Sequence, residues 1–510
     1  MQPFGAIFAA IPIRPIPLEV PIPSFSPRKL MTNPPPPCNK RFAFISVTAL
    51  FFMWGFITCM NDLLIPKFKA DFDLNQRQAN MVQFAFFGAY FLVSLIYFLI
   101  SAAKGDPINR IGYKNGLVLG LLVAGAGCFL FYPAADTHQF ALFLGALGLL
   151  GAGVTIIQIA ANPYVTILGP EESGSSRLNL AQGFCSLGYV IAPFVGGILL
   201  FGSDVFKGTN KVGLESLKAP YVGLGIVFVV IAVIFKMISL PNFTQEGKVE
   251  PGITAFRHKH FVWGWLAIFF YVGSEVTIGS ILINYLGDKG VMGLTESESA
   301  KYLSFCWGGL MIGRLMGAIS LGDIRQSKKL PYMVLAAVVS TGIIYACASF
   351  KQFLTTGQHI HPLDIMPFIG LVAMSFVFFS IGKSSAGRMI GLFALVAAAL
   401  TVFSMSTHGS YALWSILGIG LFNSIMWSNI FSLSIRGLGK DTSQGSSLLV
   451  MMIVGGALMP LAQGWLTDTY GIRASLGIVL LGYIYLIFFG FFAPKAKGSN
   501  GDGIRAGTGH

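Results

Sequence analysis

Runs of about 20 consecutive apolar residues recur along this chain, and they constrain its fold more than any other feature. A helix of that length crosses roughly 30 Å of hydrocarbon. The strands of a membrane β-barrel are only about ten residues long and alternate in polarity, which these runs do not. Charged residues make up 11% of the 510 residues, against about 25% in a soluble domain. The sequence therefore predicts an all-α polytopic membrane protein.

The apolar runs fall into two groups on either side of a polar stretch from Pro241 to His260. The first group is expected at 43–66, 80–102, 115–133, 139–168, 177–202 and 219–239. The second group is expected at 261–286, 300–322, 331–350, 364–382, 389–406, 411–435, 445–467 and 473–493. The chain thus has about 14 predicted spans.

The two halves resemble each other in sequence. ALFFMWG, which ends at Gly55, matches AIFFYVG, which ends at Gly273, and GSSRL from Gly174 matches GSSLL from Gly445. The first interval is 119 residues and the second is 172, a difference of 53. Two further helices with short loops need about that length, at roughly 20 residues per span. We therefore predict a 6+6 helix repeat with a two-helix insertion in the second half.

This repeat divides the chain into five parts. They are a disordered Pro-rich extension (1–41), a six-helix bundle (42–240), a linker (241–260), a second bundle (261–494) with the inserted pair at about 331–382, and a disordered tail (495–510). Met1 and Met31 are both possible starts. The loops on the side of the termini are richer in Lys and Arg, which predicts that both termini and the linker are cytoplasmic.

The net charge of +13 is explained by these basic loops rather than by nucleic-acid binding, because no basic stripe with interleaved aromatic residues is present. The six cysteines are isolated and form no CxxC motif, which argues against a disulfide framework or a zinc site. No HExxH, nucleophile elbow or Walker loop is present, which argues against a membrane enzyme.

Two acidic residues lie inside apolar runs. FFMWGFITCMNDLLIPKF places Asn61 and Asp62 in the first run, and Glu275 lies about 14 residues into the run that begins at Phe261. A charge near the centre of a membrane helix costs about 2.5–3.5 kcal/mol, so such an acid usually binds a proton, an ion or a polar substrate. The alternative for Asp62 is that it lies near enough to the helix end to reach water. In the repeat register the two acids differ in depth by about 7–8 Å, so we expect two separate sites.

Several motifs resemble the fucose–galactose–glucose:proton symporter family of the major facilitator superfamily. They are FFMWGFITCMND, QFAFFGAYF, ALFLGALGLLGAGVTIIQIAANPYVTILGPE, SRLNLAQGFCSLG, YVGSEVTIGSILINYLG and GLFNSIMWSNIFSL, and the similarity extends from about Phe42 to Pro494. Gln158 and Glu275 stand where fucose permeases have an acid and an amide, so the chain is most similar to the bacterial glucose/galactose permeases. It departs from them at Trp427-Ser428-Asn429, where relatives have Phe-Pro-Thr.

The resemblance implies proton-coupled hexose uptake by alternating access, with Asp62 as the proton-coupling acid. Glu275, as a second acid inside an apolar run, is expected to bond sugar hydroxyls or to act as a second proton-coupling acid. It also implies a monomer in a bacterial inner membrane, with no cofactor other than the coupling ion. Three alternatives stay open: coupling to Na⁺, a preference for N-acetylglucosamine or fucose, and a membrane sugar receptor that does not transport.

A hexose site needs amides and carboxylates for the hydroxyls and an aromatic platform for the apolar face. The candidate sugar ligands are Asn61, Gln83, Gln158, Asn162, Asn179, Gln182, Glu275, Asn284, Asn423, Trp427 and Asn429. The candidate platforms are Trp54, Phe87, Tyr271, Trp307 and Trp427. The alternative role for each amide is a hydrogen bond between neighbouring helices. We expect Arg314, which ends an apolar run, to extend to the membrane interface.

Overall fold

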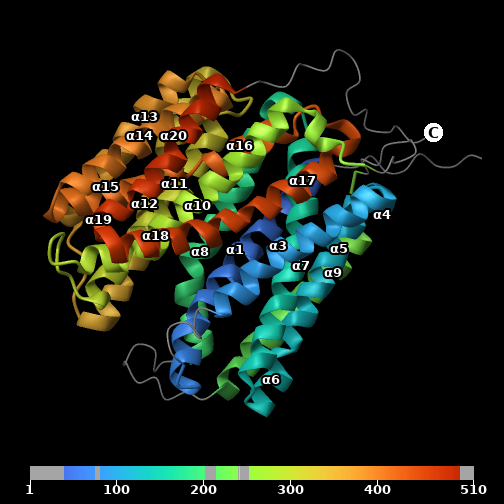
Figure 1. Ribbon diagram of the computed structural model, residues 1–510, viewed down its shortest axis with the longest axis horizontal. Coiled ribbons are helices and arrows are strands. Elements are labelled where there is room, and N and C mark those ends of the chain that lie inside the picture. The colour runs from blue at the N-terminus through green and yellow to red at the C-terminus, as the bar shows by residue number, and fades with distance from the viewer. Residues whose placement is uncertain (1–39, 75–80, 202–213, 239, 242–251, 494–510) are drawn as a thin grey trace, which may run out of the picture. The chain divides into compact units, whose positions relative to one another are not determined.

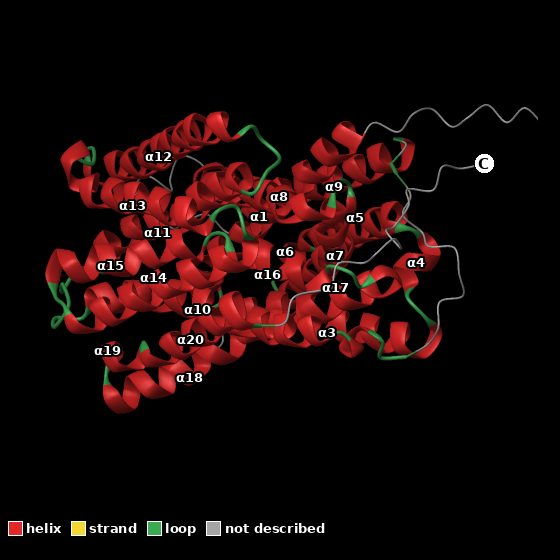
Figure 2. Cartoon of the chain, turned by 90° about the horizontal axis from the view of Figure 1, so that it is seen from above, coloured by secondary structure: helices red, strands yellow, loops and turns green. Residues whose placement is uncertain are grey.

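The described part of the computed structural model comprises residues 40–74, 81–201, 214–238, 240–241 and 252–493. Within these ranges every regular element is a helix, and 13 helices are long and apolar enough to cross a membrane (Figure 2). This confirms the predicted all-α polytopic fold. The predicted N-terminal extension up to residue 39, the C-terminal tail and most of the linker lie outside the described residues.

The first half contains eight helices in its described part, of which α4 and α6 are short. They are α1 (Lys40–Asp71), α3 (Met81–Lys104), α4 (Pro107–Ile111), α5 (Tyr113–Phe129), α6 (Phe131–Thr137), α7 (Phe140–Ile167), α8 (Gly174–Phe201) and α9 (Lys218–Met237). Short 3₁₀ helices, η1 (Glu171–Ser173) and η3 (Leu214–Leu217), precede α8 and α9.

The second half begins with η4 (Ala255–Arg257), α10 (Lys259–Gly287) and α11 (Glu296–Ser320). It continues with α12 (Gln326–Thr356), η5 (Pro362–Ile365), α13 (Met366–Gly382), α14 (Ala386–Ser406), α15 (Gly409–Asn423), α16 (Met426–Ile435), η6 (Gly439–Asp441), α17 (Thr442–Met451), η7 (Met452–Val454), α18 (Gly455–Tyr470), α19 (Ile472–Ser475) and α20 (Gly477–Phe492).

Four of the spans predicted as single runs are interrupted in the structure. The run at 115–133 breaks at Leu130, between α5 and α6, and the run at 473–493 breaks at Leu476, between α19 and α20. The run at 411–435 breaks into α15 and α16 at Ser424 and Ile425. The run at 445–467 is divided into α17 and α18 by the single 3₁₀ turn η7. Hydropathy alone does not detect these breaks, because the residues at each break are as apolar as their neighbours or nearly so.

The repeat is visible in the packing of the opening helices. α1 packs along α8, and a Cβ at Gly55 would overlap the carbonyl oxygen of Cys185. α10 packs along α18 in the same way, and a Cβ at Gly273 would overlap the side chain of Met459. The two matched glycines therefore serve the same purpose, since each permits a close helix crossing in its own half.

The helix pairing also identifies which helices are additional. α5 packs against α7 and α9, and α14 packs correspondingly against α15 and α20. α14 therefore matches α5, which leaves α12 and α13 without a counterpart in the first half. α12 packs on α11 at the edge of the second half, and α13 packs on α14 and α15 (Figure 2). We infer that α12 and α13 are the inserted pair.

The two halves meet mainly through three helices of each half. α17 of the second half packs on α3 and α7 of the first (Figure 1). α8 of the first half packs on α11 and α16 of the second. The functional residues described below lie mainly on these helices and on α10.

Candidate functional site

A buried ion pair lies between two helices of the second half. Nη2 of Arg314 on α11 is 3.8 Å from Oε1 of Glu275 on α10, and the side chains are 8% and 15% exposed. The hydroxyl of Tyr271, one turn before Glu275, lies close to both charged groups without hydrogen-bond geometry to either. The carboxylate therefore keeps acceptor capacity for a ligand hydroxyl.

The expectation that Arg314 extends to the membrane interface was wrong. Its Nε donates to the carbonyl oxygen of Ser424 at 3.2 Å, and its Nη1 donates to Ser186 Oγ at 2.6 Å and to the carbonyl oxygen of Gln182 at 3.5 Å. Ser424 lies at the break between α15 and α16, and Ser186 lies on α8. Arg314 thus joins the two halves and is held inside the protein by partners on several elements.

A second polar cluster lies in the first half. Gln158 and Asn162, one turn apart on α7, are at most 1% exposed, and no side-chain nitrogen or oxygen of either has a hydrogen-bond partner among the described residues. The buried hydroxyl of Tyr90 on α3 lies close to Trp54, Thr58 and Gln158. Buried amides without partners cost roughly 1–3 kcal/mol each, which favours a ligand at this place.

Cys185 connects the two clusters. Its side chain is 2% exposed and lies within electrostatic range of Tyr90, Arg314 and Glu275. The unpartnered amides of α7 and the ion pair of α10 and α11 therefore flank the same segment of α8. Groups of this kind, contributed by both halves, suit a polyhydroxylated ligand.

A pair of asparagines joins the halves beside this site. Asn179 Nδ2 on α8 donates to Asn429 Oδ1 on α16 at 2.9 Å, and also to the carbonyl oxygen of Ser175 at 2.8 Å. Asn179 Oδ1 and Asn429 Nδ2 have no partner among the described residues. Gln182, one turn further along α8, likewise keeps an unpartnered Nε2. These three atoms provide one acceptor and two donors.

Of two other predicted ligands, Asn423 makes a contact of a structural kind and Asn284 is exposed. Asn423 Oδ1 accepts a hydrogen bond of 3.0 Å from the Tyr483 hydroxyl on α20. Asn284 is exposed near the end of α10, about 13 Å along the helix from Glu275, and the structure does not bring it into the cluster.

The predicted aromatic platforms are distributed around both clusters. Trp427 is buried, has an unpartnered Nε1, and stacks on Phe431 with ring centres 6.0 Å apart. Trp307 of α11 stacks with Tyr189 of α8 across the boundary at 6.4 Å. Phe87 lies beside Tyr90, with ring centres 5.7 Å apart.

Three predicted residues cannot be placed at the level of side chains. Asn61 and Asp62 lie in α1 and Gln83 lies in α3, but their side chains are outside the described part of the structure. Their predicted roles stay predictions.

Sequence reasoning missed Arg314, Ser186 and Tyr90. A signal for Arg314 was available in its neighbours, because Gly309, Gly313 and Gly317 recur every four residues along α11. A Cβ at Gly313 would overlap the side chain of Ser424. Because α11 packs this closely on its neighbours at these glycines, the adjacent Arg314 lies inside the bundle rather than at its surface.

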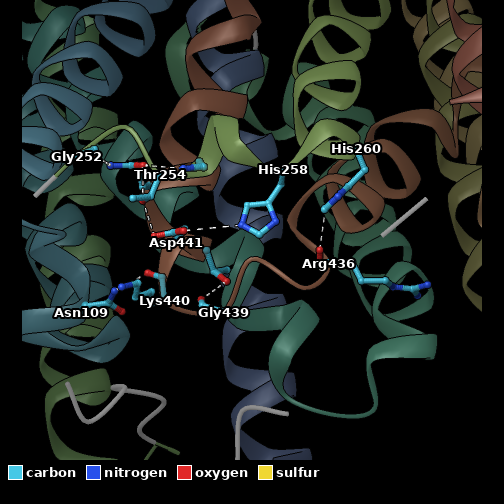
Figure 3. A network of polar contacts seen from close by, with 12 residues as sticks. Asn109, Gly252, Thr254, His258, His260, Arg436, Gly439, Lys440 and Asp441 are labelled. Atoms are coloured by element: carbon cyan, nitrogen blue, oxygen red, sulfur yellow. Dashed lines mark hydrogen bonds and ion pairs between the residues drawn. The ribbon is translucent and has the colours of Figure 1, made fainter. Parts of the chain in front are cut away.

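A further polar network links the halves at the end of the bundle where α10 begins (Figure 3). Asp441 accepts a hydrogen bond of 2.6 Å from Thr254 Oγ1 and lies 3.9 Å from His258 Nε2. Asn109 of α4 donates to the carbonyl oxygen of Lys440 at 2.8 Å. His260 Nε2 donates to the carbonyl oxygen of Arg436 at 2.9 Å. We call residues 436–441 the clasp loop.

The clasp loop also contacts the segment before α8. The backbone N–H of Gly437 donates to Glu171 Oε1 at 3.1 Å, and Arg436 Nη2 donates to the carbonyl oxygen of Glu171 at 3.2 Å. The clasp loop is therefore held by the first half, by the segment before α10, and by α10 itself.

Comparison with known proteins agrees with this architecture. The family model described as Major Facilitator Superfamily matches residues 42–394. A glucose/galactose transporter of Brucella abortus biovar 1 (strain 9-941) is 40% identical over 90% of this chain and 95% of its own length. The L-fucose-proton symporter of Escherichia coli (strain K12) is 29% identical over 84% of this chain and 87% of its own length.

A solved structure shows the same fold. It is the crystal structure of a Major Facilitator Superfamily transporter, FucP, in the outward conformation, with a TM-score of 0.69 and 26% identity. The match covers 89% of this chain and 99% of that one. The family model, the relatives and the helical repeat agree, and the chain belongs to the Major Facilitator Superfamily.

Proposed function

We propose that this protein is a secondary active transporter that takes up a hexose, glucose or galactose, together with a proton. The observation that carries the proposal is the 40% identity to a glucose/galactose transporter over 90% of the chain. The relatives reported above are transporters, so the chain is a transporter and not an enzyme.

The proposed sugar site lies between the two polar clusters. Gln158 and Asn162 supply amides from the first half, and Glu275 supplies a carboxylate from the second. Asn179, Gln182 and Asn429 supply the atoms that lack partners among the described residues. Amides and carboxylates bond neighbouring hydroxyls in pairs, which is the chemistry that a hexose requires. Asn61, Gln83, Asn284, Asn423 and Trp427 are further proposed ligands from the sequence.

The proposed coupling acids are Asp62 and Glu275. Burial favours the neutral form of a carboxyl group, so Asp62 would bind a proton from the outside while the site is open to that side. A neutral Asp62 would let the loaded halves move, and both cargoes would leave on the inside. Glu275 either bonds sugar hydroxyls or titrates as a second site.

The protein is a multi-pass membrane protein, for which we propose the bacterial inner membrane with both termini cytoplasmic. We also propose that it acts as a monomer with the domain limits predicted above. In this orientation the clasp loop is cytoplasmic. Its contacts with Asn109 and Glu171 support a conformation closed toward the cytoplasm.

The test is uptake of labelled glucose and galactose into proteoliposomes that contain the full chain, with an imposed pH gradient. We expect concentrative uptake that collapses with a protonophore. Asp62→Asn should abolish concentrative uptake and retain sugar counterflow, which needs no net proton movement. Concentrative uptake by Asp62→Asn would contradict the proton role of this acid.

The same vesicles separate the alternatives. A Na⁺ gradient at constant pH would drive uptake if Na⁺ were the coupling ion. Competition with N-acetylglucosamine and L-fucose would identify a different sugar preference. Saturable sugar binding without counterflow would identify a receptor that does not transport.

A further inference from the structure

Arg314 has more partners than a purely structural ion pair needs. Its guanidinium contacts a carboxylate on α10, a carbonyl oxygen at the α15–α16 break, and a hydroxyl on α8. Each of its three nitrogens is directed at a different element, and α8 belongs to the other half. A buried cation of this kind is costly unless its partners are well placed, so its position depends on all of them.

The link to Ser186 has a defined direction. Ser186 Oγ donates its own hydrogen to the carbonyl oxygen of Gln182 at 3.1 Å and accepts from Arg314 Nη1 at 2.6 Å. The hydroxyl therefore has both its donor and an acceptor position in use. Arg314 also contacts Glu275, so this link lies beside the Glu275 part of the proposed sugar site.

The link to Glu275 is looser. At 3.8 Å the two charges attract each other, but the carboxylate keeps room to accept hydroxyl groups. A ligand bonded to Glu275 would change the electrostatic attraction between its carboxylate and Arg314. The guanidinium would then shift, and its hydrogen bond to Ser186 would change with it. Glu275 and Ser186 would then be coupled without touching each other.

We infer that Arg314 is a positioning residue of the transport site, which orients the Glu275 carboxylate for sugar hydroxyls and connects it to Ser186 of the other half. The inference rests on the proposed sugar transport. It goes beyond the proposed transport by naming Arg314 as the residue through which sugar binding at Glu275, in the second half, affects the position of the first half.

A double-mutant cycle tests this connection. The dissociation constant for the transported hexose is measured on purified full-length protein for Ser186→Ala, Glu275→Gln and the double variant. We expect the effect of Ser186→Ala on this constant to differ at least 3-fold between the wild-type and Glu275→Gln backgrounds. Additive effects would overturn the inference.

Ser176→Ala is the matched control. Ser176 on α8 donates to the carbonyl oxygen of Ala318 on α11 at 2.6 Å, so it joins the same two helices by a bond of equal length to a neutral group. Its effect should be additive with Glu275→Gln. Coupling as strong as that of Ser186 would mean that the contact between α8 and α11, and not Arg314, relates the two positions.

Arg314→Lys separates positioning from stability. Lysine keeps the charge but lacks the planar fork that reaches three partners. We expect a melting temperature near that of the wild type with sugar affinity at least 10-fold weaker, and unchanged affinity would overturn the inference. Absence of binding and counterflow by the wild-type protein with every hexose tested would instead refute the proposed function.

Discussion

Asn179 on α8 and Asn429 on α16 share a hydrogen bond of 2.9 Å across the boundary between the halves, and each amide keeps one unpartnered atom. The free acceptor of Asn179 and the free donor of Asn429 match two hydroxyls of one sugar. The contact therefore contributes both to the interface and to the proposed site.

Removing either asparagine should weaken sugar binding more than it weakens the fold. We expect Asn179→Ala or Asn429→Ala to raise the KM of hexose counterflow about 10-fold, because each removes an amide atom that is proposed to bond a sugar hydroxyl, worth roughly 1–3 kcal/mol. The double variant should be little worse than either single one. An unchanged KM in both single variants would assign this pair to packing alone.

Gln158→Leu should separate stability from function. Both side-chain polar atoms of Gln158 are buried without a hydrogen-bond partner among the described residues, so an apolar side chain of similar size removes a desolvation cost of about 1–3 kcal/mol. We expect an equal or higher melting temperature together with a KM for hexose raised at least 10-fold. A lower melting temperature with normal transport would show that Gln158 has a structural partner instead.

Gly55→Ala tests the helix crossing that places the first-half cluster. A Cβ here would overlap the Cys185 carbonyl, so α1 and α8 would have to separate. We expect a loss of about 1–3 kcal/mol of stability, typical of overpacking, and loss of transport. The control is Gly223→Ala on α9, where a Cβ meets nothing within 4 Å and where alanine should stabilise the helix slightly.

Features of this fold that depend on residues close together in the sequence can be predicted from the sequence, whereas contacts between residues far apart in the sequence cannot. Spans and repeats follow from local hydropathy and from motif spacing, so Gly55 and Gly273 can be paired from the amino-acid sequence alone. The one-turn spacing of Gln158 and Asn162 likewise places both on one face of α7, and both are buried there.

The partners of Arg314 could not be predicted in the same way. They come from α8, α10 and the α15–α16 break, up to 132 residues away in the chain. A hydropathy profile records that a charge lies near the end of a run, but it does not record which helices cross there. The break at Ser424, which places a carbonyl oxygen beside the guanidinium, is equally invisible in an apolar sequence.

Asp106 should make stability depend on pH. It lies in the loop before α4, where Oδ1 accepts from Tyr97 at 2.6 Å and from the N–H of Ile108 at 2.9 Å. Burial raises its pKa to about 6, while these hydrogen bonds act in the opposite direction. The native state therefore binds the proton more tightly than the unfolded chain does. The resulting stability is fully present below about pH 4 and is lost as the pH rises through about 6.

The measurement is the melting temperature of the purified protein between pH 7.5 and pH 5. Wild type should gain roughly 1.4 kcal/mol between pH 7.5 and pH 5, about half of the roughly 3 kcal/mol that the full pKa shift is worth, and Asp106→Asn should remove most of that gain. Asp468→Asn, at an exposed acid on α18, is the control and should leave the profile unchanged. A wild-type profile that falls on acidification through this range would contradict the raised pKa.

Asp441→Asn should weaken the clasp loop and shift the protein away from the conformation described here. The carboxylate accepts from Thr254 and lies beside His258, so an amide loses the charge that both contacts favour. Since the clasp loop also contacts Asn109 and Glu171, its release should let the two halves separate at this end.

Spin labels on cysteines introduced at the exposed positions Arg110 and Lys328 would report that separation as a distance distribution. We expect a longer-distance population to grow in Asp441→Asn at neutral pH. Asp323→Asn, at an exposed acid in the loop between α11 and α12, should leave the distribution as in the wild type. Identical distributions in all three proteins would mean that Asp441 does not hold the halves together, and that the contacts of Glu171 with Arg436 and Gly437 suffice.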